Sequence, residues 1–267
     1  MSRIGQLFQN LKRDGRKALI AYLTAGDPSP DRTPALVEAL VRGGADLIEL
    51  GVPFSDPIAD GPVIQRGGER ALKAGTTLRG VLDIAAQIRA SSEVPLLLFT
   101  YLNPVMRYGL ERLAEDAANC GIDGCLLTDA SVDEAHEYVG AMRRHGLDTV
   151  FLAAPTSTER RLRLVAQYST GFVYLVSRTG VTGERESLSN QVAPLIEAVR
   201  RVTDLPLAVG FGVSKAEHVA ELGRQVEAVA VGSAIVRLIE QNRDNPSLEI
   251  QLESFTRELK RGFGAHA

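Results

Sequence analysis

Two carboxylates near the end of one apolar stretch are the residues in this sequence best suited to acid–base chemistry. Glu49 stands between Ile48 and Leu50, and Asp60 follows in a loop rich in Pro, Gly and Asp. A carboxyl group at the end of a buried strand loses hydration, so we expect the pKa of Glu49 to be raised. Asp60 is expected to stay ionised in its polar loop. The pair predicts a proton carrier beside an electrostatic stabiliser, and the simpler interpretation is a structural Glu and a turn Asp.

Size and composition limit both the architecture and the partners. The chain has 267 residues, 45% of them hydrophobic and 24% charged, with a formal net charge of −3. This length suits two small domains or one (β/α)8 barrel. No basic block that could follow a nucleic acid, no apolar run of membrane-helix length and no secretory leader is evident. The two cysteines and four histidines lack zinc-ligand spacing, so we expect a cytoplasmic protein with reduced thiols and no metal.

Strand-like and helix-like segments alternate along the chain and must position the two carboxylates. Apolar runs typical of strands occur at Ala18–Leu23, Leu47–Leu50, Pro95–Tyr101, Gly124–Leu127, Thr149–Ala153, Phe172–Val176, Leu207–Gly210 and Ala228–Val231. Amphipathic segments typical of helices occur at Thr33–Arg42, Leu78–Ala90, Leu110–Asn119, Asp133–Arg144, Glu159–Gln167, Gln191–Arg201, Lys215–Leu222 and Ile235–Asn242. Extra helices are expected at Ile4–Lys12 and Leu248–Lys260. The pattern predicts one domain over residues 1–267, a single (β/α)8 TIM barrel with an extra N-terminal and an extra C-terminal helix, and the alternative is an open doubly wound sheet.

Glycine loops follow the last two predicted strands and precede helices. They are Gly210-Phe211-Gly212 and Gly232-Ser233. Bare backbone N–H groups and a helix N-terminus attract anions, and these two loops are where such barrels commonly hold phosphate. Although a lone glycine pair is often just a tight turn, two adjacent loops predict a phosphorylated small molecule. The long polar loop of residues 177–187 is expected to act as a lid, or else is a variable surface loop.

Several motifs in order resemble the alpha-subunit family of tryptophan synthase, almost from end to end. They are Ala25-Gly26-Asp27-Pro28, residues 49–57 with Ala59-Asp60-Gly61-Pro62, residues 174–183, and residues 232–236. The resemblance implies a lyase of tryptophan biosynthesis that cleaves indole-3-glycerol phosphate to indole and glyceraldehyde 3-phosphate, a retro-aldol reaction without metal or organic cofactor. It implies Glu49 as the general acid–base, Asp60 as acceptor of the indole N–H, and Tyr174 as an assisting group.

The resemblance assigns further site residues by their positions in these motifs. It implies a substrate pocket formed by Tyr22, Phe99, Tyr101, Leu126 and Leu152, with Thr182 bonding Asp60 when the lid closes. It also implies a phosphate cradle of Gly183, Phe211, Gly212, Gly232 and Ser233. Other phosphate-binding barrels fit less well, because a metal-dependent epimerase needs histidine ligands at strand ends and an indole-glycerol-phosphate synthase needs a lysine acid there.

A protein partner is implied as well: the pyridoxal-phosphate-dependent beta subunit of tryptophan synthase, in an alpha2beta2 complex that passes indole through a tunnel. The implied contacts are Pro53, Asp56, Asn103, Asp129 and Ser131. Where the family usually has proline this chain has Ser131, so we expect a looser contact loop and weaker affinity for the partner. Two alternatives remain open at this point, a lyase that works alone and a chain that chiefly activates the beta subunit.

Overall fold

Eight parallel strands form a closed barrel in which each strand pairs with its neighbours in sequence. The computed structural model describes residues 2–176, 188–210 and 212–264. Its strands are β1 (Ala18–Thr24), β2 (Leu47–Gly51), β3 (Leu96–Thr100), β4 (Gly124–Leu127), β5 (Asp148–Ala153), β6 (Val173–Leu175), β7 (Leu207–Val209) and β8 (Ala228–Val231). Parallel pairing of β1 with β8, from Ala18 opposite Ala228 to Ala21 opposite Val231, closes the sheet. The predicted barrel is therefore confirmed, and the open-sheet alternative is wrong.

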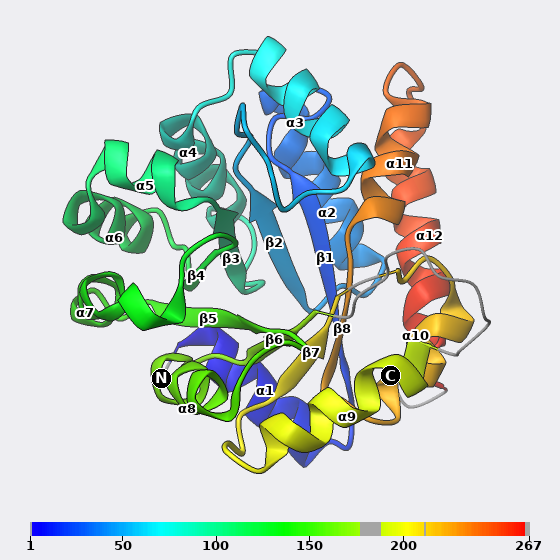
Figure 1. The fold of residues 1–267 in the computed structure, drawn as a ribbon. Helices are drawn as coiled ribbons and strands as arrows, with labels where there is room; N and C mark the ends of the chain where they lie inside the picture. The colour runs from blue at the N-terminus through cyan, green and yellow to red at the C-terminus, as the bar shows by residue number, and fades with distance from the viewer. Residues whose placement is uncertain (1, 177–187, 211, 265–267) are drawn as a thin grey trace.

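Helices surround the strands (Figure 1). They are α1 (Arg3–Arg13), α2 (Thr33–Arg42), α3 (Pro62–Lys73), α4 (Leu78–Arg89), α5 (Leu102–Tyr108), α6 (Leu110–Asn119), α7 (His136–Arg144), α8 (Glu159–Tyr168), α9 (Leu188–Arg200), α10 (Ala216–Gly223), α11 (Ser233–Asn242) and α12 (Leu248–Arg261), with short 3-10 turns η1 (Pro30–Arg32) and η2 (Val132–Glu134). The expected extra helices at both ends are present as α1 and α12. Within the described ranges, none of these helices is both long and apolar enough to span a membrane.

The helices differ from the sequence expectation in three places. Helix α3 was not predicted, because Gly67 and Gly68 in its middle lower its helical propensity. Helix α5 was also missed, since it has only seven residues and includes Pro104. The predicted helix at Asp133–Arg144 is divided, because the 3-10 turn η2 covers its start and the α-helix α7 begins only at His136. All three elements lie in or next to loops at one end of the barrel.

Helix α1 closes the amino-terminal end of the barrel. Its buried residues Ile4, Phe8 and Leu11 join the side chains inside the strands in one apolar cluster. The Phe8 ring packs on Phe172 just before β6, with ring centroids 5.7 Å apart. Because the amino-terminal half of the barrel interior is filled by side chains, any open space in the barrel must lie toward the carboxyl ends of the strands.

Carboxylates fix the amino-terminal ends of alternate strands. In each case the residue before an even-numbered strand accepts the backbone N–H at the start of the preceding strand, and the pairs are Asp46 with Leu19 at 2.7 Å, Asp123 with Leu96 at 2.8 Å and Glu227 with Leu207 at 2.9 Å. Each carboxylate also binds a cation, namely Lys260, Arg89 and Arg200. These bonds tie helices α12, α4 and α9 to the end of the barrel away from the candidate site.

Candidate active site

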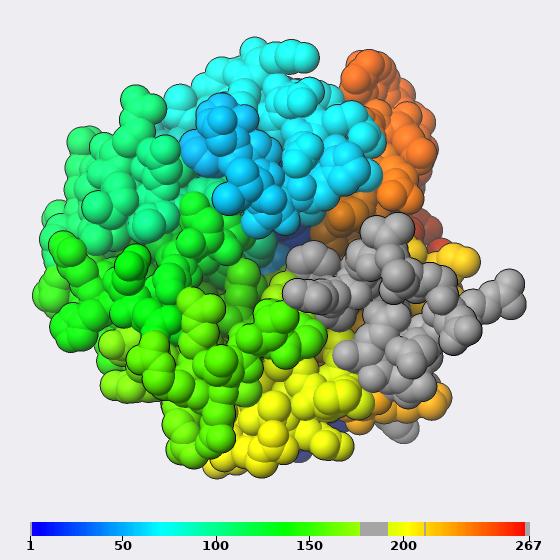
Figure 2. Space-filling view, in the orientation of Figure 1, coloured from blue at the N-terminus to red at the C-terminus, as the bar shows by residue number. Residues whose placement is uncertain are grey.

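A cavity of about 570 Å³ opens among the carboxyl ends of the strands and the loops that follow them. Figure 2 shows this end of the barrel, where the deep blue of β1 is visible at the base of a hollow beside the cyan segment that leads into α3. Its wall includes Glu49, Asp60 and Tyr174, which the sequence singled out for chemistry. The volume is in the range usual for sites that enclose a small molecule.

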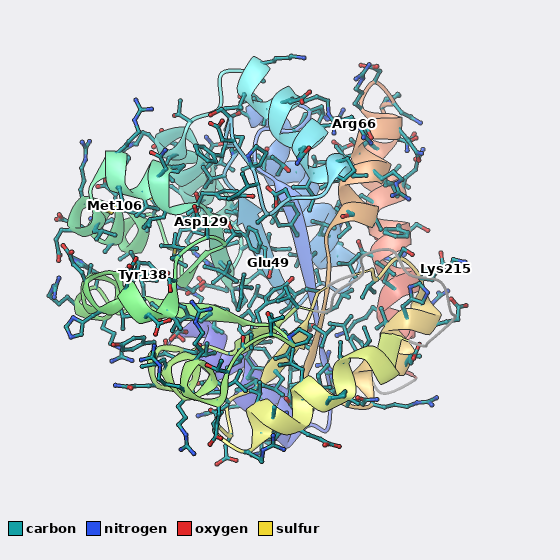
Figure 3. All side chains as sticks on the ribbon, in the orientation of Figure 1. Glu49, Arg66, Met106, Asp129, Tyr138 and Lys215 are labelled. Carbon is teal, nitrogen blue, oxygen red and sulfur yellow. The ribbon has the colours of Figure 1, made fainter. Side chains whose placement is uncertain are left out.

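The register of β2 turns Glu49 into the barrel. Glu49 pairs with Tyr22 of β1 and Leu97 of β3, and side chains alternate along a strand, so Leu47 and Glu49 face inward while Ile48 and Leu50 face the helices. Figure 3 shows Glu49 near the centre of the barrel.

Burial then controls how Glu49 ionises. The residue is 1% exposed, and its Oε1 atom has no hydrogen-bond partner among the described residues. Loss of hydration raises the pKa of this carboxyl to about 8, as the apolar flanks predict. Glu49 is therefore mostly protonated at neutral pH, and its pKa is close enough to neutral for the carboxyl both to give up and to take back a proton.

Asp60 lies at the entrance to α3, and its main chain is firmly held. Its N–H donates to the Pro57 carbonyl at 3.1 Å, and its own carbonyl accepts from Gln65 Nε2 at 2.9 Å. Burial raises the pKa of its carboxyl to about 6, opposed by a hydrogen bond from Tyr101. The loop is thus less polar around Asp60 than its composition indicates. Asp60 is nevertheless roughly nine-tenths ionised at pH 7.

Tyr101 supports the loop that carries Asp60 and is not part of the cavity wall. Its hydroxyl accepts from the Ala59 N–H at 3.2 Å, and its ring lies 5.2 Å from that of Phe54. The predicted pocket residue Leu126 is also off the wall, because it is fully buried in the inner cluster below the cavity. These two residues therefore support the lining residues without lining the cavity themselves.

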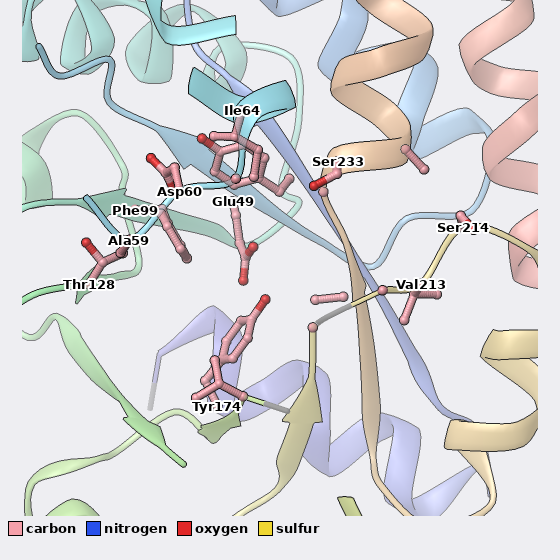
Figure 4. A pocket seen from close by; sticks show the side chains of 18 of the residues that line it. Glu49, Ala59, Asp60, Ile64, Phe99, Thr128, Tyr174, Val213, Ser214 and Ser233 are labelled. Atoms are coloured by element: carbon pink, nitrogen blue, oxygen red, sulfur yellow. The ribbon is translucent and has the colours of Figure 1, made fainter. Parts of the chain in front are cut away.

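Aromatic and aliphatic side chains form an apolar wall, as predicted for Tyr22, Phe99 and Leu152. The rings of Tyr22 and Phe99 meet edge to face with centroids 5.3 Å apart. Burial raises the pKa of the Tyr22 and Tyr174 hydroxyls far above the usual value, so both keep their protons and can donate. Figure 4 shows the Tyr174 hydroxyl and the Glu49 carboxyl pointing toward one another across the cavity.

Glycine makes room for these tyrosine hydroxyls. A Cβ atom added at Gly210 would lie 1.8 Å from Tyr174 Oη, and one added at Gly51 would lie 2.2 Å from Tyr22 Oη. Both distances are far below any real contact. The positions of the two hydroxyls therefore depend on having no side chain on the neighbouring strand end.

The opposite part of the wall has free backbone donors. Gly212, Gly232 and Ser233 all line the cavity, and Gly212 has a φ of +72° that favours glycine. Among the described residues no side chain caps the N-terminus of α11, where the first helical bond runs from the Val236 N–H to the Gly232 carbonyl at 3.0 Å. The N–H groups before that bond are open to an anion. The other predicted cradle and lid residues, Thr182, Gly183 and Phe211, lie outside the described residues.

The cavity wall also contains residues that sequence reasoning missed. They are Ala59, Gly61, Ile64, Thr128, Val176, Ala230, Ala234 and Arg237, and the wall also includes Gly210, Val213 and Ser214 of the predicted glycine loop. Ile64 was hidden because α3 was not predicted. Thr128 could have been found, since it directly follows a predicted strand, and Arg237 could have been found one helical turn beyond Ser233. Within the described ranges, no group of three or more His, Cys, Asp or Glu side chains is arranged to hold a metal ion.

Two of the predicted partner-contact residues, Asp129 and Asn103, lie on segments that are joined by a hydrogen bond. Asp129 accepts the backbone N–H of Leu102 at 2.7 Å, which joins the loop after β4 to the start of α5 and so to Asn103. Asp56 and Asn103 are exposed, whereas Pro53 is buried and offers no surface.

The loop with Ser131 is held more firmly than the missing proline indicates. Ser131 Oγ accepts from Arg161 Nη2 of α8 at 3.1 Å, and Asp133 forms ion pairs with Arg160 and Arg161. Ser131 also has a φ of −68°, the value that proline would impose. Side-chain bonds to α8 therefore restrict a loop that the sequence led us to expect loose.

Comparison with known proteins adds independent evidence. The family model described as tryptophan synthase alpha chain matches residues 8–263. The tryptophan synthase alpha chain of Solibacter usitatus is 81% identical over 100% of both chains, and that of Geotalea uraniireducens is 48% identical over 99% of both. A crystal structure of tryptophan synthase subunit alpha from Legionella pneumophila superposes with a TM-score of 0.91 at 34% identity, covering 98% of each chain. The chain therefore belongs to the tryptophan synthase alpha chain family.

Proposed function

We propose that this chain is a lyase that cleaves indole-3-glycerol phosphate to indole and glyceraldehyde 3-phosphate in tryptophan biosynthesis. One observation carries the proposal: a mostly protonated Glu49 and a mostly ionised Asp60 share one cavity with the open N-terminus of α11. The wall with Phe99 and Leu152 suits a flat aromatic ring, and the helix N-terminus suits a phosphate. The substrate joins these two groups by a short glycerol chain.

Glu49 would carry the proton through the reaction. Cleavage requires a proton on C3 of the indole and removal of the proton from the hydroxyl on the adjacent glycerol carbon. Protonated Glu49 gives its proton to C3, and the resulting carboxylate takes the hydroxyl proton as the carbonyl of glyceraldehyde 3-phosphate forms and the carbon–carbon bond breaks. The electron pair of that bond returns to the ring, which leaves as indole. A pKa of about 8 suits both halves of this transfer near neutral pH.

Asp60 would stabilise the charge that the first proton transfer creates. Protonation at C3 places positive charge on the ring nitrogen, and an ionised carboxylate that accepts the indole N–H opposes that charge. Tyr101 and Ala59 hold the loop that carries Asp60 in place. Tyr174, with its hydroxyl protonated and turned toward Glu49, would donate a hydrogen bond to the reacting part of the substrate.

The direct experiment is an assay of indole release from indole-3-glycerol phosphate by the purified chain. We expect turnover in the wild type and none above background in Glu49→Gln, whose amide keeps the shape but cannot transfer a proton. Binding of glycerol 3-phosphate by the variant serves as the control for folding. Retention of more than a tenth of wild-type activity by Glu49→Gln would rule out the acid–base assignment.

We further propose that the rim of the cavity docks onto a tryptophan synthase beta subunit, in an alpha2beta2 complex located in the cytoplasm. Two large apolar side chains are exposed close in sequence to the exposed Asp56 and Asn103, namely Ile58 at 84% and Met106 at 57%. Ile58 lies in the loop after β2 and Met106 on α5, and a contiguous apolar patch formed by such side chains would mark an interface. The free Cys120 and Cys125 are consistent with a reducing compartment.

The indole-release assay with and without beta subunit separates the remaining alternatives. Turnover that is unaffected by the beta subunit would favour a lyase that works alone. Turnover that stays negligible alone, together with stimulation of the beta reaction, would favour a chain that acts chiefly as an activator. We expect measurable turnover alone and an increase on adding the partner.

A further inference from the structure

Arg237 is the one cationic side chain on the cavity wall among the residues that the structure describes. It lies on α11 four residues after Ser233, which places both side chains on the same face of the helix, one turn apart. The acidic residues on the wall are Glu49 and Asp60. At neutral pH the first is mostly neutral and the second mostly ionised, so among the described lining residues Arg237 alone brings a positive side-chain charge to this cavity.

No carboxylate among the described residues neutralises the charge of Arg237. Glu240 lies three residues further along α11 and could neutralise it, but both Glu240 oxygens are taken by other cations. Arg66 binds them at 2.7 and 2.8 Å, and Arg70 binds one of them at 2.9 Å. The Arg66 bond is the main cause that holds the pKa of Glu240 at about 2. In the described part of the chain, Arg237 itself makes no ion pair.

Backbone dipoles alone do not balance the charge of the proposed substrate. The N-terminus of a helix acts as roughly half a positive charge, whereas a phosphate monoester has up to two negative charges near neutral pH. Asp60 adds another negative charge to the same cavity. A guanidinium beside the N-terminus of α11 would offset this excess without touching the reacting atoms.

We propose that Arg237 binds and orients the phosphate dianion of the substrate and selects phosphorylated over uncharged ligands. This inference rests on the proposed function, because it names the residue that gives the phosphate end of that cavity its charge. Arg237 is a positioning residue in this scheme. Its exposed side chain comes from α11, one turn after Ser233, whereas Glu49 comes from β2 and is buried.

The test compares Arg237→Gln and Arg237→Lys with the wild type. In calorimetric titrations with glycerol 3-phosphate, Arg237→Gln is expected to raise the Kd roughly three- to thirty-fold, and Arg237→Lys to restore part of the loss. In the indole-release assay, Arg237→Gln should raise KM by a similar factor while kcat stays within about two-fold. The variant should also lose much of the salt dependence of kcat/KM, since the attraction is electrostatic.

A matched control is available on α12. Arg257→Gln makes the same change of charge at an exposed residue that pairs with Glu253 and does not line the cavity. It should leave the Kd for glycerol 3-phosphate and the salt dependence unchanged.

Three outcomes would overturn the inference. The first is wild-type affinity of Arg237→Gln for glycerol 3-phosphate, and the second is an equal loss in the Arg257→Gln control. The third is an equal loss of affinity for indolepropanol, which has the ring but no phosphate, because that would indicate a general distortion of the cavity. Failure of the proposed function is distinguishable: a wild type that releases no indole refutes the lyase activity, while the titrations still decide the role of Arg237.

Discussion

The pH dependence of indole release tests the two-carboxylate mechanism directly. Burial raises the pKa of Glu49 to about 8 and the pKa of Asp60 to about 6. The proposed reaction needs the first carboxyl protonated and the second ionised, so the active combination prevails only between those values. We therefore expect kcat/KM to follow a bell-shaped profile with its maximum near pH 7.

The size of the effect follows from two independent ionisations. At pH 7 roughly 80% of the molecules have the active combination, whereas at pH 5 and at pH 9 roughly 9% do. Indole release at limiting substrate should fall roughly nine-fold from pH 7 to either extreme. Asp60→Asn should lower turnover roughly a hundred- to a thousand-fold at pH 7 and retain the decline above pH 8, which belongs to Glu49.

The assay is steady-state indole release between pH 4.5 and 9.5 at constant ionic strength, with circular dichroism to confirm that the chain stays folded. A phosphate monoester also ionises near pH 6, so the substrate itself contributes to the acidic side of the profile. Comparison with Asp60→Asn isolates the contribution of the enzyme, because the substrate is the same in both. Profiles of identical shape below pH 7, or a wild-type rate that stays flat up to pH 9.5, would refute the assignment of the two groups.

Three further predictions follow from the same structure. Glu49→Gln should raise the free energy of unfolding, measured by urea unfolding, by about 1–3 kcal/mol at pH 7 and little at pH 4. The unfolded wild type loses the Glu49 proton near pH 4.5 and the folded state keeps it up to about 8, so wild-type stability falls as pH rises between these values, and a variant that is not stabilised at pH 7 would contradict this. Gly232→Asp should weaken glycerol 3-phosphate binding at least ten-fold and indolepropanol binding far less, as calorimetry would show, since its carboxylate would repel the anion; equal losses would indicate misfolding. Ser131→Pro should change the affinity for a beta subunit by less than about two-fold, because the gain of about 0.4–1 kcal/mol from a stiffer chain is offset by loss of the hydrogen bond from Arg161. Tightening of five-fold or more in a titration with the beta subunit would show that this hydrogen bond does not restrain the loop.

The strands could be predicted because their signal is local. Apolar runs such as those around Leu47 and Leu207 are bounded by turn residues, and the observed strands differ from the predicted ones mainly by a residue or two at their ends. The burial of Glu49 could be predicted in the same way, from its immediate neighbours Ile48 and Leu50. Closure of the sheet was inferred from the number of units, and the pairing of β1 with β8 establishes it.

Helix α3 shows why other features could not be predicted. A Cβ atom added at Gly67 would lie 2.9 Å from Val236 Cγ1 of α11 and 3.1 Å from Thr24 Oγ1 of β1. The glycine is therefore required by close packing between segments far apart in the sequence, and it lowers the local helical signal at the same time. The desolvation of Asp60 has a similar origin, since Tyr101 comes from the end of a different strand.

The barrel separates the residues that stabilise it from the residue whose burial is unfavourable. A one-residue shift of β2 would turn Glu49 toward the helices and away from the cavity, so its place depends on the strand register. That register is fixed at the opposite end, where Asp46 directly before β2 binds the Leu19 N–H at 2.7 Å and Lys260 at 2.6 Å. Because the bonds that set the register lie at the amino-terminal end, Glu49 at the other end needs none of them, and among the described residues burial is the cause that raises its pKa while its Oε1 has no partner.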